Sequence, residues 1–142
     1  MNKIMGILFA FALFIGCASS PRPTPQQIAE ADYGDPPSKY QDSIKGVISP
    51  KLFDPYSAIY TFSVPDKGWN NMLGKTIYGY SVCGSINAKN RFGGYVGAKP
   101  FYSFFRNESL VVFIHDRFVL PDSFALGMMA GAKLYSPDIL CR

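Results

Sequence analysis

Side chains that perform catalysis or bind metal ions are scarce in this chain of 142 residues. It contains one histidine, His115, two glutamates, Glu30 and Glu108, and scattered aspartates. It has no Gly-x-Ser-x-Gly motif, and its cysteines and histidine lack the close spacing of zinc ligands. These absences argue against a metal site, a hydrolase with paired carboxylates and an α/β-hydrolase nucleophile. We therefore expect no catalytic residues, no metal and no cofactor.

Charged side chains and long apolar runs are also few. Charged residues make up 17% of the chain, the net charge is +4, and there is no dense basic run. A nucleic-acid partner is therefore not expected. The longest apolar run, Ile4–Ile15, has twelve residues, fewer than the roughly 20 that a helix needs to cross a bilayer. By contrast, 48% of the residues are hydrophobic and 15% are aromatic, which is typical of a globular domain.

The apolar run belongs to an export signal. Lys3 precedes it and small residues close it at positions 16–20, which is the three-part layout of a signal peptide. The sequence Leu13-Phe14-Ile15-Gly16-Cys17 resembles the bacterial lipoprotein box. The resemblance implies that residues 1–16 are removed as a signal peptide and that Cys17 carries palmitate-like acyl chains, which anchor the protein in a membrane. The alternative is an ordinary signal peptide with a cysteine at its cleavage site by chance.

The segment after the lipidation site is rich in proline. Prolines favour an extended polyproline conformation of about 3 Å per residue. We therefore predict a lipidated cysteine and Pro-rich spacer over residues 17–37, followed by a periplasmic domain over residues 38–142. Ala18 follows the cysteine at the position where lipoproteins retained in the inner membrane commonly carry aspartate. The resemblance therefore implies sorting to the outer membrane, in a protein of the cell envelope that faces the periplasm. A proline-rich recognition peptide is the alternative for this segment.

Two cysteines remain for the domain. Cys83 and Cys141 can pair in an oxidising compartment such as the periplasm. The alternative is a buried Cys83 in a strand and a free thiol at Cys141, and the sequence does not give the Cα separation that decides between them.

The periodicity of apolar residues predicts one helix and four strands. Tyr40, Ile44, Val47 and Ile48 have helical spacing, and Pro50 ends that helix. Residues 66–75, which include Trp69, contain glycines and asparagines and are predicted to form a loop. Strands are predicted over residues 58–64, 76–88, 95–105 and 110–114, and a possible C-terminal helix over residues 123–134. We expect an α+β fold in which one N-terminal helix packs on an antiparallel four-stranded meander.

The segment between residues 83 and 101 has the most unusual composition. Its glycines permit conformations that a side chain would block, its asparagines can order a turn, and its lysines and arginine make it locally positive. The possible binding surface consists of Asn87, Lys89, Asn90, Arg91, Gly93, Gly94 and Tyr95. The alternative is a hairpin with glycine bulges. A phosphate loop is disfavoured, because a strand and not a helix is predicted to follow.

Two motifs resemble a known group of proteins. The first motif is Asp54-Pro55-Tyr56-Ser57-Ala58. The second begins at Cys83 and reads Cys-Gly-x-Ile-Asn-Ala-Lys-Asn-x-Phe-Gly-Gly-Tyr-x-Gly. Together they resemble a family of small bacterial lipoproteins and secreted proteins of unknown function. The likeness extends from about Tyr33 to Ile114. It implies an exported α+β domain and no particular activity.

Three functions are compatible with these features. The first is a non-enzymatic, outer-membrane-anchored lipoprotein that binds another envelope protein or supports an envelope assembly. The second is a small-ligand or inhibitor module with a pocket on the concave sheet face, lined by Tyr78, Tyr80 and Phe101. The third is an envelope hydrolase that uses His115, although the neighbouring Asp116 would point to the opposite face of the strand.

Overall fold

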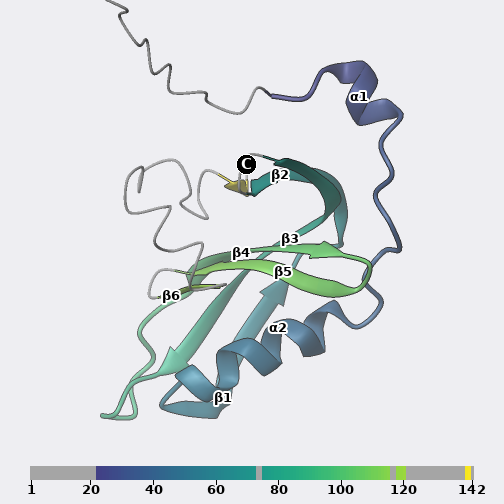
Figure 1. Ribbon diagram of the computed structural model, residues 1–142. Coiled ribbons are helices and arrows are strands. Elements are labelled where there is room, and N and C mark those ends of the chain that lie inside the picture. The colour runs from purple at the N-terminus through teal and green to yellow at the C-terminus, as the bar shows by residue number, and fades with distance from the viewer. Residues whose placement is uncertain (1–21, 73–74, 116–117, 121–139, 142) are drawn as a thin grey trace, which may run out of the picture.

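The protein folds around one strongly curled antiparallel β-sheet (Figure 1). The structure is a computed structural model, and it describes residues 22–72, 75–115, 118–120 and 140–141. The predicted signal peptide, Cys17, Asp116 and the predicted helix over residues 123–134 lie outside the described residues. The strands are β1 (Asp54–Phe62), β2 (Asp66–Met72), β3 (Lys75–Lys89), β4 (Lys99–Arg106), β5 (Ser109–His115) and β6 (Phe118–Leu120).

The prediction of an α+β fold with one helix packed on a four-stranded meander is wrong. The part of the chain that the structure describes is mostly β. Its helices are short: α1 (Pro25–Ala29), and α2 (Tyr40–Ile48), which continues into the 3-10 turn η1 (Ser49–Lys51). The main cause of the error is that β2 was expected to be a loop, because its glycine and asparagines have low strand propensity. Cross-strand pairing of β2 with β3 overrides that propensity, and Trp69 lies opposite Tyr78.

The strand order is β1-β3-β4-β5-β6, and β2 pairs with β3 as well. All pairs are antiparallel. The long strand β3 pairs with β2 along its first half and with β1 along its second half, so β1 and β2 share one edge. Ser63 lies between β1 and β2. Its N–H donates to the Cys83 carbonyl at 2.7 Å, and its Oγ accepts from the Cys83 N–H at 3.0 Å, so the pairing with β3 continues across the break.

Two glycines allow β3 to lie close to its neighbours. A Cβ at Gly84 would lie 2.0 Å from the Thr61 carbonyl oxygen and 2.5 Å from the Phe101 ring. A Cβ at Gly79 would lie 2.1 Å from the Phe105 carbonyl oxygen. All three distances are shorter than any van der Waals contact, so only glycine permits this packing.

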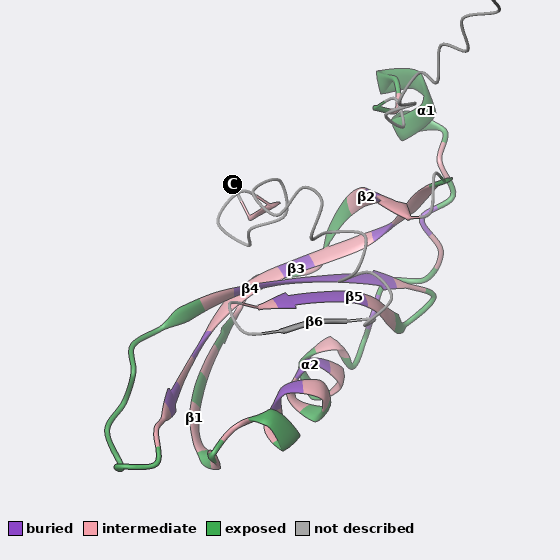
Figure 2. Cartoon of the chain, turned by 60° about the vertical axis from the view of Figure 1, so that its left-hand side comes forward, coloured by how far each residue is buried: buried purple, intermediate pink, exposed green. Residues whose placement is uncertain are grey.

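Helix α2 covers one face of the sheet (Figure 2), and its buried residues belong to the same apolar cluster as residues of the strands. Ile44 and Ile48 are fully buried, and Tyr40 and Val47 pack on the same cluster, as their spacing predicts. The helix starts at Tyr40, and its N-cap residue Lys39 makes no side-chain cap hydrogen bond. The hydroxyl of Ser38, one residue earlier, donates to the Glu108 carboxylate at 3.0 Å. The sheet residues of this cluster are Val82, Ile86, Phe101, Phe105 and Phe113.

The opposite face of the sheet holds a second apolar cluster. It consists of Tyr102, Phe104, Val112 and Ile114, with Leu140 and Cys141 among the partly buried residues packed on it. Strand β4 is therefore buried on both faces. Burial raises the pKa of the Tyr102 hydroxyl to about 12, and a hydrogen bond with Asn70 opposes this shift.

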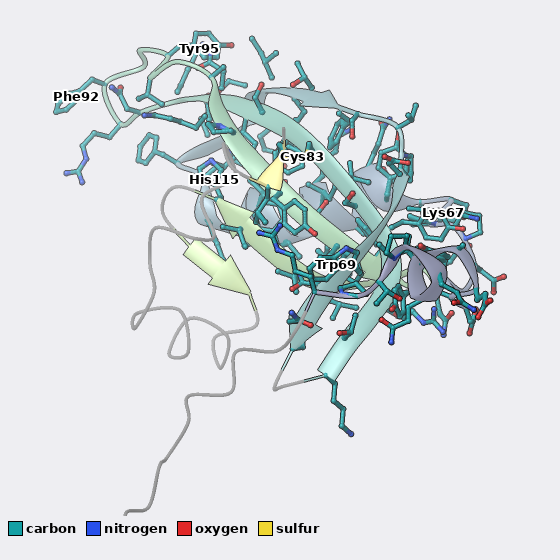
Figure 3. All side chains as sticks on the ribbon, turned by 90° about the horizontal axis from the view of Figure 1, so that it is seen from above. Lys67, Trp69, Cys83, Phe92, Tyr95 and His115 are labelled. Atoms are coloured by element: carbon teal, nitrogen blue, oxygen red, sulfur yellow. A yellow bond between two sulfur atoms is a disulfide. The ribbon has the colours of Figure 1, made fainter. Side chains whose placement is uncertain are left out.

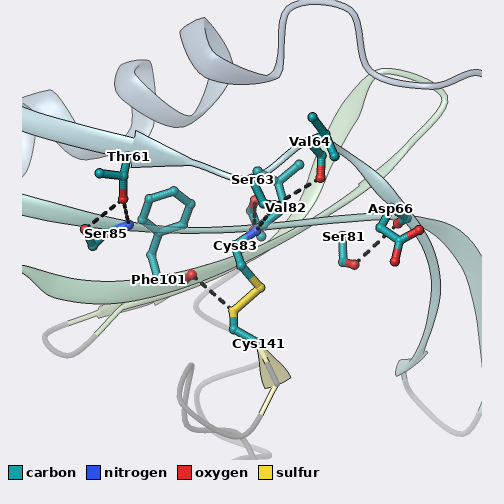
Figure 4. The surroundings of a disulfide bond; sticks show 11 residues. Thr61, Ser63, Val64, Asp66, Ser81, Val82, Cys83, Ser85, Phe101 and Cys141 are labelled. Atoms are coloured by element: carbon teal, nitrogen blue, oxygen red, sulfur yellow. Dashed lines mark hydrogen bonds between the residues drawn. A yellow bond between two sulfur atoms is a disulfide. The ribbon is translucent and has the colours of Figure 1, made fainter.

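The disulfide between Cys83 and Cys141 is confirmed (Figure 4). Their Cα atoms lie 5.7 Å apart, which is a usual separation for a disulfide. The bond joins the middle of β3 to the end of the chain, 58 residues later. It fixes the C-terminus on the second apolar cluster.

The residues before α2 are attached to the sheet. Tyr33 is buried, its ring makes edge contacts with Tyr78 and Tyr80, and its hydroxyl donates to the Ile28 carbonyl at 2.8 Å. Lys67 Nζ lies 5.0 Å from the centre of the Tyr33 ring. The predicted spacer therefore includes the short helix α1 and a residue that packs on the domain. None of the helices described is long and apolar enough to cross a membrane.

Candidate binding site

A pocket of about 550 Å³ lies at one end of the sheet. It is surrounded by the segment that follows α2, the ends of β3 and β5, the start of β4, and the loop between β3 and β4. The size is within the range of about 300 to 1,000 Å³ that is usual for small-molecule sites. Its lining residues are Lys51, Leu52, Phe53, Ile86, Ala88, Lys89, Asn90, Arg91, Phe92, Val96, Lys99 and His115.

The loop between β3 and β4 is ordered by the side chain of Asn90. Its Oδ1 accepts from the N–H groups of Phe92 at 2.9 Å and Gly94 at 3.2 Å. The Gly93 N–H donates to the Asn90 carbonyl at 3.0 Å. Gly93 has a φ of 80°, a backbone conformation that residues other than glycine rarely adopt. The asparagine and glycine therefore make a defined turn that presents Phe92 at the tip of the loop (Figure 3).

The same loop is attached to the neighbouring strands. The Tyr95 hydroxyl donates to the Ser57 carbonyl in β1 at 3.0 Å, and Lys89 Nζ lies 5.4 Å from the centre of the Tyr95 ring. The Gly97 N–H donates to Asn87 Oδ1 at 3.0 Å. These contacts hold the loop on both sides of its tip, so this wall of the pocket has a defined conformation.

The residues of the predicted binding surface take two roles. Lys89, Asn90 and Arg91 line the pocket. The others shape the loop through the turn, the ring contact and the hydrogen bonds described above; they are Asn87, Gly93, Gly94 and Tyr95. The segment that spans residues 90–98 connects two antiparallel strands, as the hairpin alternative predicts, although β4 starts at Lys99 and not at residue 95.

The opposite wall of the pocket was not predicted from the sequence. Lys51 is the last residue of η1, and Leu52 and Phe53 join η1 to β1. The side chain of Phe53 is 72% exposed and that of Phe92 is 88% exposed, so two phenyl rings lie at the rim in water. Pro50 marks the end of the helix, but no local signal shows that the next three residues meet the loop between β3 and β4.

The charged side chains among the described lining residues of the pocket have one sign. Lys51, Lys89, Arg91 and Lys99 line it, and its lining residues, as far as the structure describes them, include no carboxylate. They also include no hydroxyl and no thiol, so His115 lines the pocket without a nucleophile among the described lining residues. Within the described ranges, no group of three histidine, cysteine or acidic residues could hold a metal ion. The arrangement suits binding of an anion that also has an apolar part.

The pocket does not use the residues that were proposed for the concave face. Phe101 is fully buried in the core, and Tyr78 and Tyr80 contact Tyr33. None of these three lines the pocket. Comparison of the chain with protein-family models, with curated proteins and with solved structures found no match.

Proposed function

We propose that this protein is a non-enzymatic binding component of the bacterial cell envelope, anchored to the outer membrane through Cys17 and facing the periplasm. The observation that carries the proposal is the pocket whose described lining holds four cationic side chains and no carboxylate. A ligand or an envelope partner with negative charge fits this site by charge complementarity.

The position of the pocket supports this function. The loop between β3 and β4 lies at the opposite end of the molecule from α1 (Figures 1 and 2). The proposed anchor precedes α1 in the chain, so a protein held at its N-terminus can present the pocket away from the membrane. The Cys83–Cys141 disulfide is consistent with an oxidising compartment, because such bonds persist in the periplasm and are rare in the cytosol.

The anchor is tested by mass analysis of the native protein. We expect an N-terminal Cys17 that carries acyl chains, and we expect Cys17→Ala to release the protein from the membrane. A chain that retains residues 1–16, or an unmodified Cys17 in the native protein, would contradict the anchor.

The binding face is tested by photo-crosslinking in intact envelopes. A photoreactive amino acid replaces Phe92 at the loop tip in one variant and Ile28 in α1 in the other, which are both exposed positions. We expect an adduct from position 92 that disappears with Arg91→Gln, and no such adduct from position 28. Equal adducts from both positions, or none from position 92, would overturn the assignment of this end as the binding face.

A further inference from the structure

We propose that the pocket binds an anionic amphiphile, that is, a single acyl or alkyl chain that ends in a carboxylate or a phosphate. The inference rests on the proposed function, because it takes the same pocket as the binding site. It adds the chemical class of the ligand, which neither the fold nor the anchor specifies.

The apolar part of the ligand would lie on the inner wall. Ile86 and Ala88 are buried residues of β3, and their side chains line the pocket together with Leu52 and Val96. Because Ile86 and Ala88 are already buried, hydrocarbon in the pocket would displace water mainly from the partly exposed Leu52 and from Val96. The exposed rings of Phe53 and Phe92 can cover the part of the chain that leaves the pocket.

The charged part of the ligand would lie among the cationic side chains. Lys89 ends β3 and Arg91 follows in the loop, and both line the pocket, where Lys89 Nζ also lies 5.4 Å from the centre of the Tyr95 ring. Asp54 is the cross-strand neighbour of Lys89 and does not line the pocket. Its Oδ1 accepts from the Ser57 N–H at 3.3 Å. The Asp54 carboxylate offsets one of the two charges of Lys89 and Arg91, so an anion at this place still meets an excess of positive charge. Hydrogen bonds between charged groups are about twice as strong as neutral ones.

A purely apolar ligand and a purely ionic ligand fit less well. An uncharged chain would not engage the charges of Lys89 and Arg91, and inorganic phosphate would leave the exposed side chains of Phe53, Phe92 and Val96 in water. A ligand with both parts satisfies both surfaces. A free fatty acid, a lysophospholipid and the headgroup of a membrane lipid share this chemistry, so the experiment has to distinguish them.

The test uses the full chain in native envelopes and a palmitate analogue with a photoreactive group at the end of its chain. We expect adducts within residues 86–99. Dodecyl phosphate should compete for labelling, whereas dodecyl maltoside, which has the same chain on a neutral headgroup, and inorganic phosphate should not. Vesicles of anionic phospholipid are a further competitor. If they compete as strongly as dodecyl phosphate, the ligand is the headgroup of a bilayer lipid; if they compete more weakly, the ligand is a monomeric lipid.

Two pairs of variants provide matched controls. Lys89 and Lys75 are the two ends of β3, and only Lys89 lines the pocket. Lys89→Gln should lower labelling about tenfold, as expected for the loss of one charge-assisted hydrogen bond, and Lys75→Gln should not. Val96 lines the pocket at 43% exposure, and Val64 is 77% exposed outside it. Val96→Glu places a negative charge at the pocket and should abolish labelling, whereas Val64→Glu should not.

The disulfide provides the check that each variant is folded. Labelling is compared only among folded variants. A variant counts as folded when it retains the Cys83–Cys141 bond in a non-reducing gel and unfolds at the wild-type temperature. Equal competition by dodecyl maltoside, or equal labelling of the pocket and control variants, would overturn the inference. If position 92 forms an envelope adduct while the palmitate analogue labels nothing, the ligand class is wrong and the proposed function stands. If neither reaction occurs, both are wrong.

Discussion

Arg106 in β4 holds Asp32 in the segment before α2. Arg106 Nη2 lies 2.7 Å from Asp32 Oδ2, and Nη1 donates to the carbonyl groups of Asp32 and Tyr78. Asp32 Oδ1 accepts from the Gly34 N–H at 2.8 Å. One carboxylate and one guanidinium therefore connect the N-terminal segment to the sheet at the end that lies far from the pocket.

This contact makes stability depend on pH. The hydrogen bond from Gly34, followed by the hydrogen bond and the charge of Arg106, lowers the pKa of Asp32 below its ordinary value of 3.8. The stabilisation by the carboxylate is therefore complete above the unfolded value and is lost as the pH falls through the lower, folded value. We expect Asp32→Asn to lower Tm at pH 7, and this difference to shrink below pH 3.8.

Asp35→Asn provides the control, because Asp35 is another exposed aspartate in the same segment. It should leave Tm and its pH dependence unchanged. A Tm difference between wild type and Asp32→Asn that is constant across the acidic range would contradict the role of the Asp32 charge.

The glycines of β3 and α2 should respond to alanine in opposite ways. A Cβ at Gly84 would lie 2.0 Å from the Thr61 carbonyl oxygen, whereas a Cβ at Gly46 in α2 would have no atom within 4 Å. We expect Gly84→Ala to lower the free energy of unfolding by about 1–3 kcal/mol through overpacking. Gly46→Ala should raise it by about 1 kcal/mol, because alanine favours the helix. Urea unfolding of both variants checks this, and changes of the same sign would contradict the packing described for β3.

The disulfide should stabilise the whole domain. Closing an interval of 58 residues constrains the unfolded chain by about 4 kcal/mol on the chain-entropy model. We expect the double variant Cys83→Ser, Cys141→Ser to lose about this much stability in urea. A reducing agent should lower the stability of the wild type to that of the variant and leave the variant unchanged. Equal stability of the reduced and the oxidised wild type in urea would contradict this prediction.

Local patterns in the sequence predicted the elements whose stability depends on near neighbours. The spacing of Ile44 and Ile48 identified a helix with one buried face, and the alternation in residues 76–88 identified β3 nearly to its ends. The cysteine pair could be proposed from composition, but its geometry could not. The loop residues Asn90 and Gly93 were identified because their side-chain chemistry is specific for turns.

The features that depend on long-range contacts could not be predicted. Strand β2 forms because β3 offers it a complete set of partners, and no residue of β2 signals this. The overall β character follows from that pairing and from β6, which precedes the segment expected to be helical. The pocket combines Lys51 with Arg91, 40 positions apart in the sequence. Only the tertiary fold brings residues such as these together, because they lie on separate elements, η1 and the loop between β3 and β4.

The order of the pocket loop should depend on the side-chain oxygen of Asn90. Asn90→Ala removes the acceptor for the N–H groups of Phe92 and Gly94, and each of these hydrogen bonds contributes about 1 kcal/mol. The turn is exposed, so the loss should be local: hydrogen exchange at both amides should become faster while Tm changes little. Asn90→Asp retains an acceptor oxygen and should restore slow exchange.

The same aspartate variant separates the order of the loop from the charge of the pocket. Asn90→Asp adds a carboxylate to a lining that holds Lys89 and Arg91, so it should weaken labelling by the palmitate analogue even though the loop is ordered. Asn90→Ala should weaken labelling through disorder instead, with fast exchange at Phe92 and Gly94. If Asn90→Asp labels as well as wild type, the charge of the pocket does not select the ligand. If Asn90→Ala exchanges as slowly as wild type, the turn is held by the backbone hydrogen bonds between Asn90, Gly93 and Gly94 alone.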